Sequence, residues 1–214
     1  GIKNGKKFKA IQTGGPSGGC LTEKHLDLPI EYDTLQAAGS MMGSGGMIVM
    51  DEDDCMVARA QFYLGFTVEE SCGKCSPCRI GNKRLFEILN KITSGKGTEE
   101  DLRKLRDLGQ VIKDTSLCGL GQTSPNPVLS TLDNFYDEYV AHVTEQRCPA
   151  HQCRDLTVYY INPKKCTGCT LCAHVCPVHA IVGERKATHI IDPNICIRCG
   201  SCLEKCRFGA IYVY

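Results

Sequence analysis

Hydrophobic residues recur at helical spacing between residues 52 and 147. Four stripes with a period near 3.6 residues predict four helices that share one core, which is a four-helix bundle. Thr98 and Asp101 form a capping pattern before the third stripe, and Pro127 marks the start of the fourth. The stripes consist of Val57, Ala60, Tyr63 and Leu64, then Leu85, Phe86, Leu89 and Ile92, then Leu102, Leu105, Leu108, Val111 and Ile112, and finally Leu129, Leu132, Tyr136, Tyr139 and Val143.

The first 51 residues follow another pattern. Strand-like segments at residues 7–12 and 47–50 are separated by glycine-rich turns, which predicts a small α+β domain. The run at residues 14–19 invites comparison with a phosphate-binding loop, but it lacks the GK[ST] ending of such loops. Turn formation by glycine and proline is the better account of this run.

The last third of the chain contains an internal repeat with an offset of 30 residues. Residues 159–166 align with 189–196, and residues 180–181 align with 210–211. Each copy reads as a strand, a cysteine loop, a helix and a strand. Since neither copy can bury its apolar face alone, we expect the two to pack together around the groups that their cysteines bind.

The 16 cysteines occur largely in CxxCxxC runs, and no leading apolar segment with a cleavage site is present. Both features favour metal ligands in a reducing cytoplasm over a disulfide framework. No stretch approaches the roughly 18 apolar residues of a membrane span, so we expect a soluble protein without direct membrane contact. A net charge of +1 gives no support for nucleic-acid binding.

The repeat carries the cysteine pattern of bacterial ferredoxins with two 4Fe-4S clusters. In this pattern three closely spaced thiolates bind one cluster, and the fourth crosses to the other cluster. The second copy has Arg207 where proline would follow, which changes the local turn but not the number of ligands. Zinc is disfavoured because its sites typically use separated CxxC pairs. The predicted ligand sets are Cys166, Cys169, Cys172 and Cys206 for one cluster, and Cys196, Cys199, Cys202 and Cys176 for the other.

A third triplet, Cys72, Cys75 and Cys78, has no fourth ligand nearby in the sequence. Cys118 lies between the predicted third and fourth helices, and a helical hairpin over residues 79–113 would return the chain toward the triplet. We therefore expect Cys118 to complete a third 4Fe-4S site in the bundle.

The whole chain resembles the NADH-binding flavoprotein subunit of respiratory complex I and its relatives in NAD-linked, electron-bifurcating iron-only hydrogenases. The matching segments are the glycine run at 14–19 with Cys20, the stretch at 53–57, the loop SCGKCSPCR at 71–79, the return at 117–121 and the junction CPAHQC at 148–153. The fused dicluster ferredoxin is more similar to the hydrogenase form. The resemblance implies an α+β, multidomain fold with a ubiquitin-like, soluble-ligand-binding domain at 1–51, a cluster-binding bundle at 52–147 and a ferredoxin domain at 148–214.

In this family the FMN and NAD(H) sites would lie upstream of Gly1, so no flavin or nucleotide residue is assigned here. The resemblance implies an electron relay between that flavin domain and partners: a thioredoxin-like 2Fe-2S subunit, a hydrogenase or other iron-sulfur large subunit, or soluble ferredoxin. The chain alone is not expected to turn over NADH. The alternatives are a free-standing ferredoxin-type carrier and a zinc-finger interaction module, and a visible spectrum separates iron-sulfur from zinc.

Four cysteines remain: Cys20, Cys55, Cys148 and Cys153. Cys148 and Cys153 flank the junction before the ferredoxin domain, and His142 lies about one and a half helical turns before Cys148. With Cys55 these residues would form a closed Cys3His set, the pattern of structural zinc, which would pin the ferredoxin to the bundle or act as a hinge. His151 is the alternative to His142, and Cys20 is the alternative to Cys55. Buried free thiols are the other interpretation.

Overall fold

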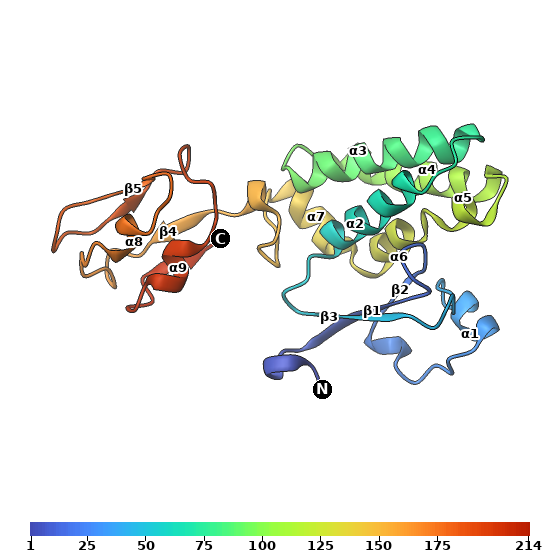
Figure 1. Ribbon diagram of the computed structural model, residues 1–214, viewed down its shortest axis with the longest axis horizontal. Coiled ribbons are helices and arrows are strands. Elements are labelled where there is room, and N and C mark those ends of the chain that lie inside the picture. The colour runs from blue at the N-terminus through green and yellow to red at the C-terminus, as the bar shows by residue number, and fades with distance from the viewer. The chain divides into compact units, whose positions relative to one another are not determined.

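The computed structural model describes residues 1–214 and divides them into two compact units, residues 1–153 and 154–214. The first unit combines a small sheet with a helical bundle, and the second contains two short sheets and two short helices (Figure 1). The prediction of an α+β multidomain fold is confirmed. None of the helices has the combination of length and apolar character that crossing a membrane requires.

A three-stranded antiparallel sheet opens the first unit, with the strand order β2-β1-β3. Residues 14–19 form the turn between β1 and β2. A Cβ atom on Gly18 would lie 1.7 Å from the carbonyl oxygen of Thr13, so only glycine fits this turn. The elements of this part are η1 (Lys3–Gly5), β1 (Phe8–Thr13), β2 (Cys20–Leu21), η2 (Glu23–His25), α1 (Tyr32–Ala37) and β3 (Met47–Asp51).

Six helices and one π-helical turn follow the sheet. Apolar side chains from the longer helices fill the core between them, and Leu64, Leu85, Leu105 and Leu132 are buried almost completely. The π-helical turn leads directly into the second helix of the bundle. The elements are α2 (Met56–Glu69), η3 (Pro77–Gly81), α3 (Asn82–Thr93), α4 (Glu99–Thr115), α5 (Gly119–Thr123), α6 (Asn126–Asn134) and α7 (Tyr136–Thr144).

The prediction of one continuous helix from Pro127 to Val143 is wrong, because the chain turns at Phe135 between α6 and α7. Phe135 packs against a small core that includes residues of the sheet, and the side chain of Asn134 donates a hydrogen bond to the carbonyl oxygen of Cys20. These contacts with the sheet replace the continuous helix that the apolar spacing indicates. Tyr136, which the stripe places in the core, is half exposed.

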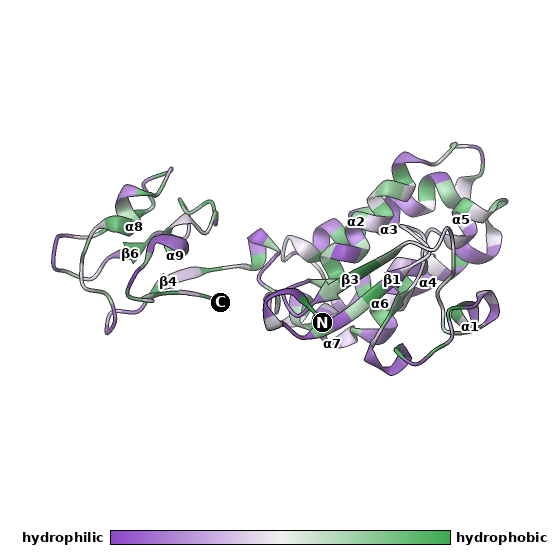
Figure 2. Cartoon of the chain, turned by 60° about the horizontal axis from the view of Figure 1, so that its bottom comes forward, coloured by the Kyte–Doolittle hydropathy of each residue, from purple (hydrophilic) through white to green (hydrophobic).

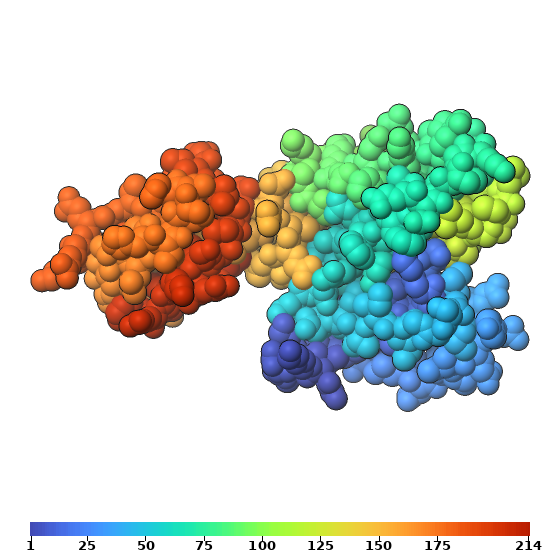
Figure 3. All heavy atoms as spheres, viewed as in Figure 1, coloured from blue at the N-terminus to red at the C-terminus, as the bar shows by residue number.

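The part of the first unit that contains the sheet packs directly against the helices of the bundle (Figure 3). Hydrophobic residues run along β3 (Figure 2). The backbone N–H of Cys20 donates to the Ser130 hydroxyl at 2.9 Å, and Lys9 forms an ion pair with Glu138 at 2.6 Å. Sheet and bundle therefore form one packed body in the first unit.

The second unit folds from the two repeat copies. The first strand of each copy pairs in antiparallel fashion with the last strand of the other, so β4 pairs with β7 and β5 pairs with β6. Each sheet thus contains one strand from each copy, as an internal two-fold arrangement requires. The elements are η4 (Arg154–Leu156), β4 (Tyr159–Ile161), α8 (Leu171–His174), β5 (Ile181–Val182), β6 (Ile190–Ile191), α9 (Ser201–Lys205) and β7 (Ile211–Val213).

Candidate iron-sulfur and metal sites

Two cavities in the second unit are each lined by four cysteines. The two cavities are similar in size. In each cavity three thiols come from one repeat copy and the fourth comes from the other copy. The first cavity is lined by Cys166, Cys169, Cys172 and Cys206, and the second by Cys196, Cys199, Cys202 and Cys176.

The two cavities have equivalent backbone surroundings. The N–H of Ala180 donates to Cys176 Sγ at 3.3 Å, and the N–H of Ala210, 30 residues later, donates to Cys206 Sγ at 3.3 Å. Each crossing thiol thus receives the same peptide donor, and such hydrogen bonds stabilise a metal-bound thiolate.

The buried thiols of these cavities stay protonated at neutral pH unless a cation binds next to them. Burial raises the pKa of Cys202 to about 11, and burial also raises the pKa of Cys172. A bound metal ion deprotonates such thiols outright. The donor set, four thiols around each cavity, therefore fits an iron-sulfur cluster.

The third set of cysteines lies at one end of the bundle. Cys72 is exposed and Cys75 is half-buried in the loop after α2, whereas Cys78 is buried in η3. Cys118 is exposed at the start of α5. The backbone N–H of Leu117 bonds to the Cys75 thiol and, with a second N–H from Cys78, holds its pKa below the usual value. The segment that carries Cys118 therefore lies against the triplet.

Other side chains around this set also suit a cluster. A Cβ on Gly121 would lie 3.1 Å from Cys78 Cβ and 2.5 Å from the side chain of Ser116. The Ser116 hydroxyl is buried and has no hydrogen-bond partner in the structure. An unpaired buried donor is costly, and cluster sulfur would supply an acceptor beside it.

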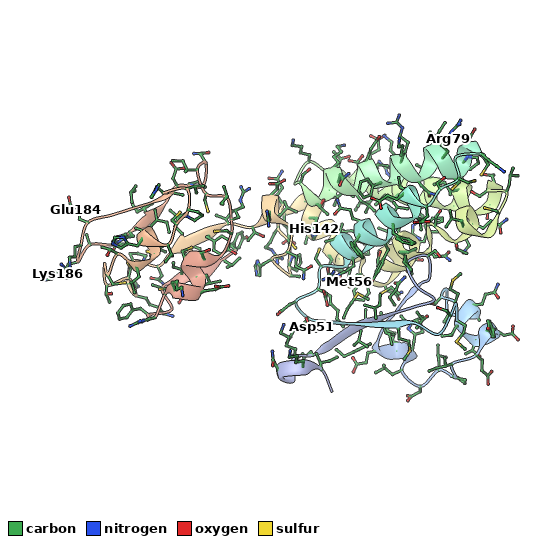
Figure 4. All side chains as sticks on the ribbon, viewed as in Figure 1. Asp51, Met56, Arg79, His142, Glu184 and Lys186 are labelled. Carbon is green, nitrogen blue, oxygen red and sulfur yellow. The ribbon has the colours of Figure 1, made fainter.

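At the other end of the bundle a buried group combines three thiols with an imidazole. Cys55, His142, Cys148 and Cys153 each place one ligand atom within 4.8 Å of the others, and all four residues are buried. Figure 4 shows His142 at the opposite end of the bundle from Arg79, the neighbour of Cys78. Cys55 immediately precedes α2, His142 lies in α7, and Cys148 and Cys153 lie in the segment after α7.

The distances within this group suit a tetrahedral ion. His142 Nε2 lies 3.3 Å from Cys55 Sγ and 3.4 Å from Cys153 Sγ, and the sulfur atoms of Cys55 and Cys153 are 3.7 Å apart. Zinc bond lengths imply separations of about 3.8 Å between sulfurs and about 3.5 Å between sulfur and nitrogen. His142 Nδ1 donates to the carbonyl oxygen of Glu138 at 2.7 Å, which orients the ring so that Nε2 faces the thiols.

The two alternative ligands lie outside this group. His151 is exposed and its backbone has a positive φ of 52°. Cys20 is buried in the sheet, and burial, together with the negative charge of Glu138, raises its pKa to about 12. Neither side chain belongs to the four-residue group.

Comparisons with known proteins identify both cysteine-rich regions. Residues 58–142 match the family described as the NADH-ubiquinone oxidoreductase-F iron-sulfur binding region, and residues 165–211 match the 4Fe-4S dicluster domain. The chain therefore contains an iron-sulfur binding region of the first family, followed by a dicluster domain of the second. It is 61% identical over 211 residues to the NADP-reducing hydrogenase subunit HndC of Solidesulfovibrio fructosivorans, an alignment that covers 99% of the chain and 43% of the relative.

Further matches are to a subunit of NADH-quinone oxidoreductase and to a solved hydrogenase structure. The chain is 40% identical over 149 residues to the F subunit of NADH-quinone oxidoreductase from Mycobacterium tuberculosis, covering 70% of the chain and 34% of that protein. A crystal structure of NAD+-reducing [NiFe]-hydrogenase in the H2-reduced state matches 65% of the chain and 24% of the solved chain, with 28% identity and a TM-score of 0.59. The chain thus spans less than half the length of these relatives.

Several polar side chains close to the thiols have no motif in the sequence that marks them. Ser71 and Asn82 both lie within hydrogen-bonding distance of Cys78, and Ser124 contacts Asn82. His189 is also buried and lines the cavity of Cys166. The position of Asn82, four residues after a cysteine in a helical segment, was the available signal for this contact.

Proposed function

We propose that this electron-transfer module holds three 4Fe-4S clusters on twelve cysteines and relays single electrons. A 4Fe-4S cluster supplies a one-electron change with little rearrangement of its ligands. The observation that carries the proposal is that each copy of the repeat supplies one cysteine, Cys176 or Cys206, to the cavity formed by the other copy. Both copies therefore contribute ligands to two closely related sites. The set of Cys72, Cys75, Cys78 and Cys118 would hold the third cluster.

The names of the relatives indicate the setting of this relay. We infer that the electrons move between a flavin and NAD(H) site on another part of the subunit and partner redox proteins in the cytoplasm. The partners would be a thioredoxin-like 2Fe-2S subunit, a hydrogenase or other iron-sulfur large subunit, or soluble ferredoxin. Support comes from the 61% identity to a hydrogenase subunit and the match of residues 58–142 to the oxidoreductase family.

The group of Cys55, His142, Cys148 and Cys153 would hold one zinc ion. Four protein ligands close the coordination shell and leave no position for substrate, so the ion would be structural. It would tie the start of α2 to the segment after α7, from which the second unit continues along the chain. The tetrahedral spacing of the ligand atoms and the hydrogen bond that orients His142 support this assignment.

The cluster content of the purified chain tests the main proposal. Anaerobically prepared protein is expected to contain about twelve iron atoms and about twelve acid-labile sulfides per chain, as three cubes require. The solution should be brown and should bleach when a reductant is added. A content near eight would remove the bundle cluster, and a colourless zinc protein would overturn the proposal.

Replacement of one bundle ligand tests the position of the third cluster. The Cys118→Ser variant should lose or alter one cluster signal in electron paramagnetic resonance spectra and keep the other two, because the ferredoxin sets share no residue with it. Cys20→Ala removes a buried thiol that belongs to none of the proposed sets, and it serves as the control with all signals retained. Loss of the ferredoxin signals in Cys118→Ser would contradict the assignment.

A further inference from the structure

Cys78 is the buried member of the bundle ligand set, and its sulfur faces two polar side chains. The Ser71 hydroxyl oxygen lies 3.3 Å from Cys78 Sγ, and Asn82 Nδ2 lies 3.5 Å from it. Asn82 follows the π-helical turn η3, which places residues 78 and 82 on the same side of the chain. Asn82 is buried to 1% exposure, so its amide has no access to solvent.

The amide of Asn82 is held from its other side by Ser124. The Ser124 hydroxyl donates to Asn82 Oδ1 at 2.8 Å, and Ser124 is completely buried. A cluster-bound Cys78 is a thiolate and only accepts hydrogen bonds, so the amide must present its NH2 group to the sulfur. The carbonyl oxygen of the same amide then faces Ser124, whose hydroxyl is the donor that this orientation requires.

We propose that Asn82, oriented by Ser124, donates a hydrogen bond to the Cys78 thiolate and raises the reduction potential of the bundle cluster. The inference rests on the proposed cluster at Cys72, Cys75, Cys78 and Cys118. Reduction adds negative charge to the cluster and its thiolates, so a donor that faces a thiolate stabilises the reduced state more than the oxidised state. The effect is large where the donor is buried, because water does not screen it. Asn82 and Ser124 are thus positioning residues that set the potential.

The Asn82→Leu variant keeps the size of the side chain and removes the donor. The oxidised-to-reduced ratio of the bundle cluster, at a fixed solution potential, is expected to increase about tenfold, which for one electron corresponds to a potential about 59 mV lower. The Ser124 hydroxyl is not left unpaired in this variant, since the carbonyl oxygen of Gly121 lies 3.0 Å from it.

Ser124→Ala tests the orienting contact, and it also tests the proposal if Asn82→Leu loses the cluster. It should lower the potential in the same direction by a smaller amount, because the amide remains but is free to turn. If Ser124 acts through Asn82, the double variant should have the potential of Asn82→Leu alone. The control is Thr123→Ala on α5, since the Thr123 hydroxyl donates to the carbonyl oxygen of Gly119 within its own helix.

The measurement is an anaerobic redox titration of the 214-residue chain, followed by electron paramagnetic resonance. The signal that disappears in Cys118→Ser identifies the bundle cluster, and the two ferredoxin clusters of the same sample are internal references that should not shift. An unchanged bundle potential in Asn82→Leu and Ser124→Ala, with the cluster present, would overturn this inference and leave the proposed function intact. Absence of a signal that depends on Cys118 in the wild-type chain would instead overturn both.

Discussion

Three thiols and one imidazole share a small buried space at the end of the bundle, so they compete for protons. Hydrogen bonds from the thiols of Cys153 and Cys55 hold the pKa of Cys148 well below its usual value, and hydrogen bonds to Cys148 and Cys55 raise the pKa of Cys153. Burial disfavours a charged His142, but hydrogen bonds to Cys148 and Cys55 outweigh this effect and raise its pKa to about 10. A divalent cation would displace these protons, which couples metal binding to ionisation of the thiols.

The His142→Ala variant tests the proposed zinc site. Wild-type protein prepared without chelator is expected to contain about one zinc per chain, and His142→Ala should lose it and keep its iron, since His142 belongs to none of the proposed cluster sets. Elemental analysis by mass spectrometry measures both metals in one sample.

His151→Ala provides the matched control for this experiment. Its side chain is exposed and lies in the same loop as two of the proposed ligands, so the variant should retain zinc. Full zinc retention in His142→Ala would exclude His142 as a ligand, and absence of zinc from the wild-type protein would exclude the site.

Residue chemistry explains which of these positions the sequence predicts. Cysteine triplets at fixed spacing have few other uses, and His142 could be placed near Cys148 by counting helical turns. The sequence left His142 and His151 as alternatives because a short loop has no periodicity that would orient its histidine. Asn82 was missed because its contact with Cys78 depends on the π-helical turn before it, which the sequence does not indicate.

At the scale of single elements, the start of α4 is held by a capping box. The backbone N–H of Asp101 donates to the Thr98 hydroxyl oxygen, and the backbone N–H of Thr98 donates to the Asp101 carboxylate at 2.8 Å. Burial opposes ionisation of Asp101, but the ion pair with Lys91 at 2.6 Å and the bonds from Thr98 outweigh it and keep its pKa below the usual value.

Thr98→Ala removes this cap and is expected to destabilise the first unit by about 1 kcal/mol. Thermal unfolding followed by circular dichroism at neutral pH measures the effect. Because the pKa of Asp101 is lowered on folding, the stabilisation by its carboxylate is present above the unfolded value and is lost only as the pH falls through the folded value. Neutral pH therefore reports the full contribution of the capping box.

Thr115→Ala, at the other end of the same helix, is the control. The Thr115 hydroxyl is exposed and donates only to the carbonyl oxygen of Val111 in its own helix, so its loss should change the midpoint little. Equal midpoints for Thr98→Ala and Thr115→Ala would show that the capping box does not stabilise α4.

Helix positions are predicted well where the core alone determines them, and poorly where another element intervenes. The stripes of Leu85 and Leu105 fall on buried faces of α3 and α4, as their spacing predicts. The stripe after Pro127 continues without interruption across Phe135, where the chain nevertheless turns to pack against the sheet. Val111 follows the apolar spacing of its helix but is 54% exposed. Periodicity shows that a helix buries one face, but it does not show where the neighbouring elements end.

At the scale of the whole molecule, the two units differ in how readily the sequence reveals them. The second unit is a duplicated segment, so its strand pairing follows from the need to bury both copies together. The first unit depends on contacts between residues far apart in the chain, such as the bond from Cys20 to Ser130 and the ion pair of Lys9 with Glu138. Neither contact leaves a local pattern, so the packing of the sheet on the bundle was not predictable from the sequence.

The activity of the 214-residue chain provides the last prediction. Its two matched regions, residues 58–142 and 165–211, are described as iron-sulfur regions, and its glycine run at 14–19 forms a tight turn in which Gly18 leaves no space for a side chain. We therefore expect the chain by itself to bind no FMN and to leave its clusters oxidised when NADH is added. Dithionite should bleach the same sample, because that reductant needs no binding site. Flavin fluorescence and the visible absorbance of one anaerobic preparation measure both effects, and bleaching by NADH at a catalytic rate would show that the chain carries a hydride-accepting site of its own.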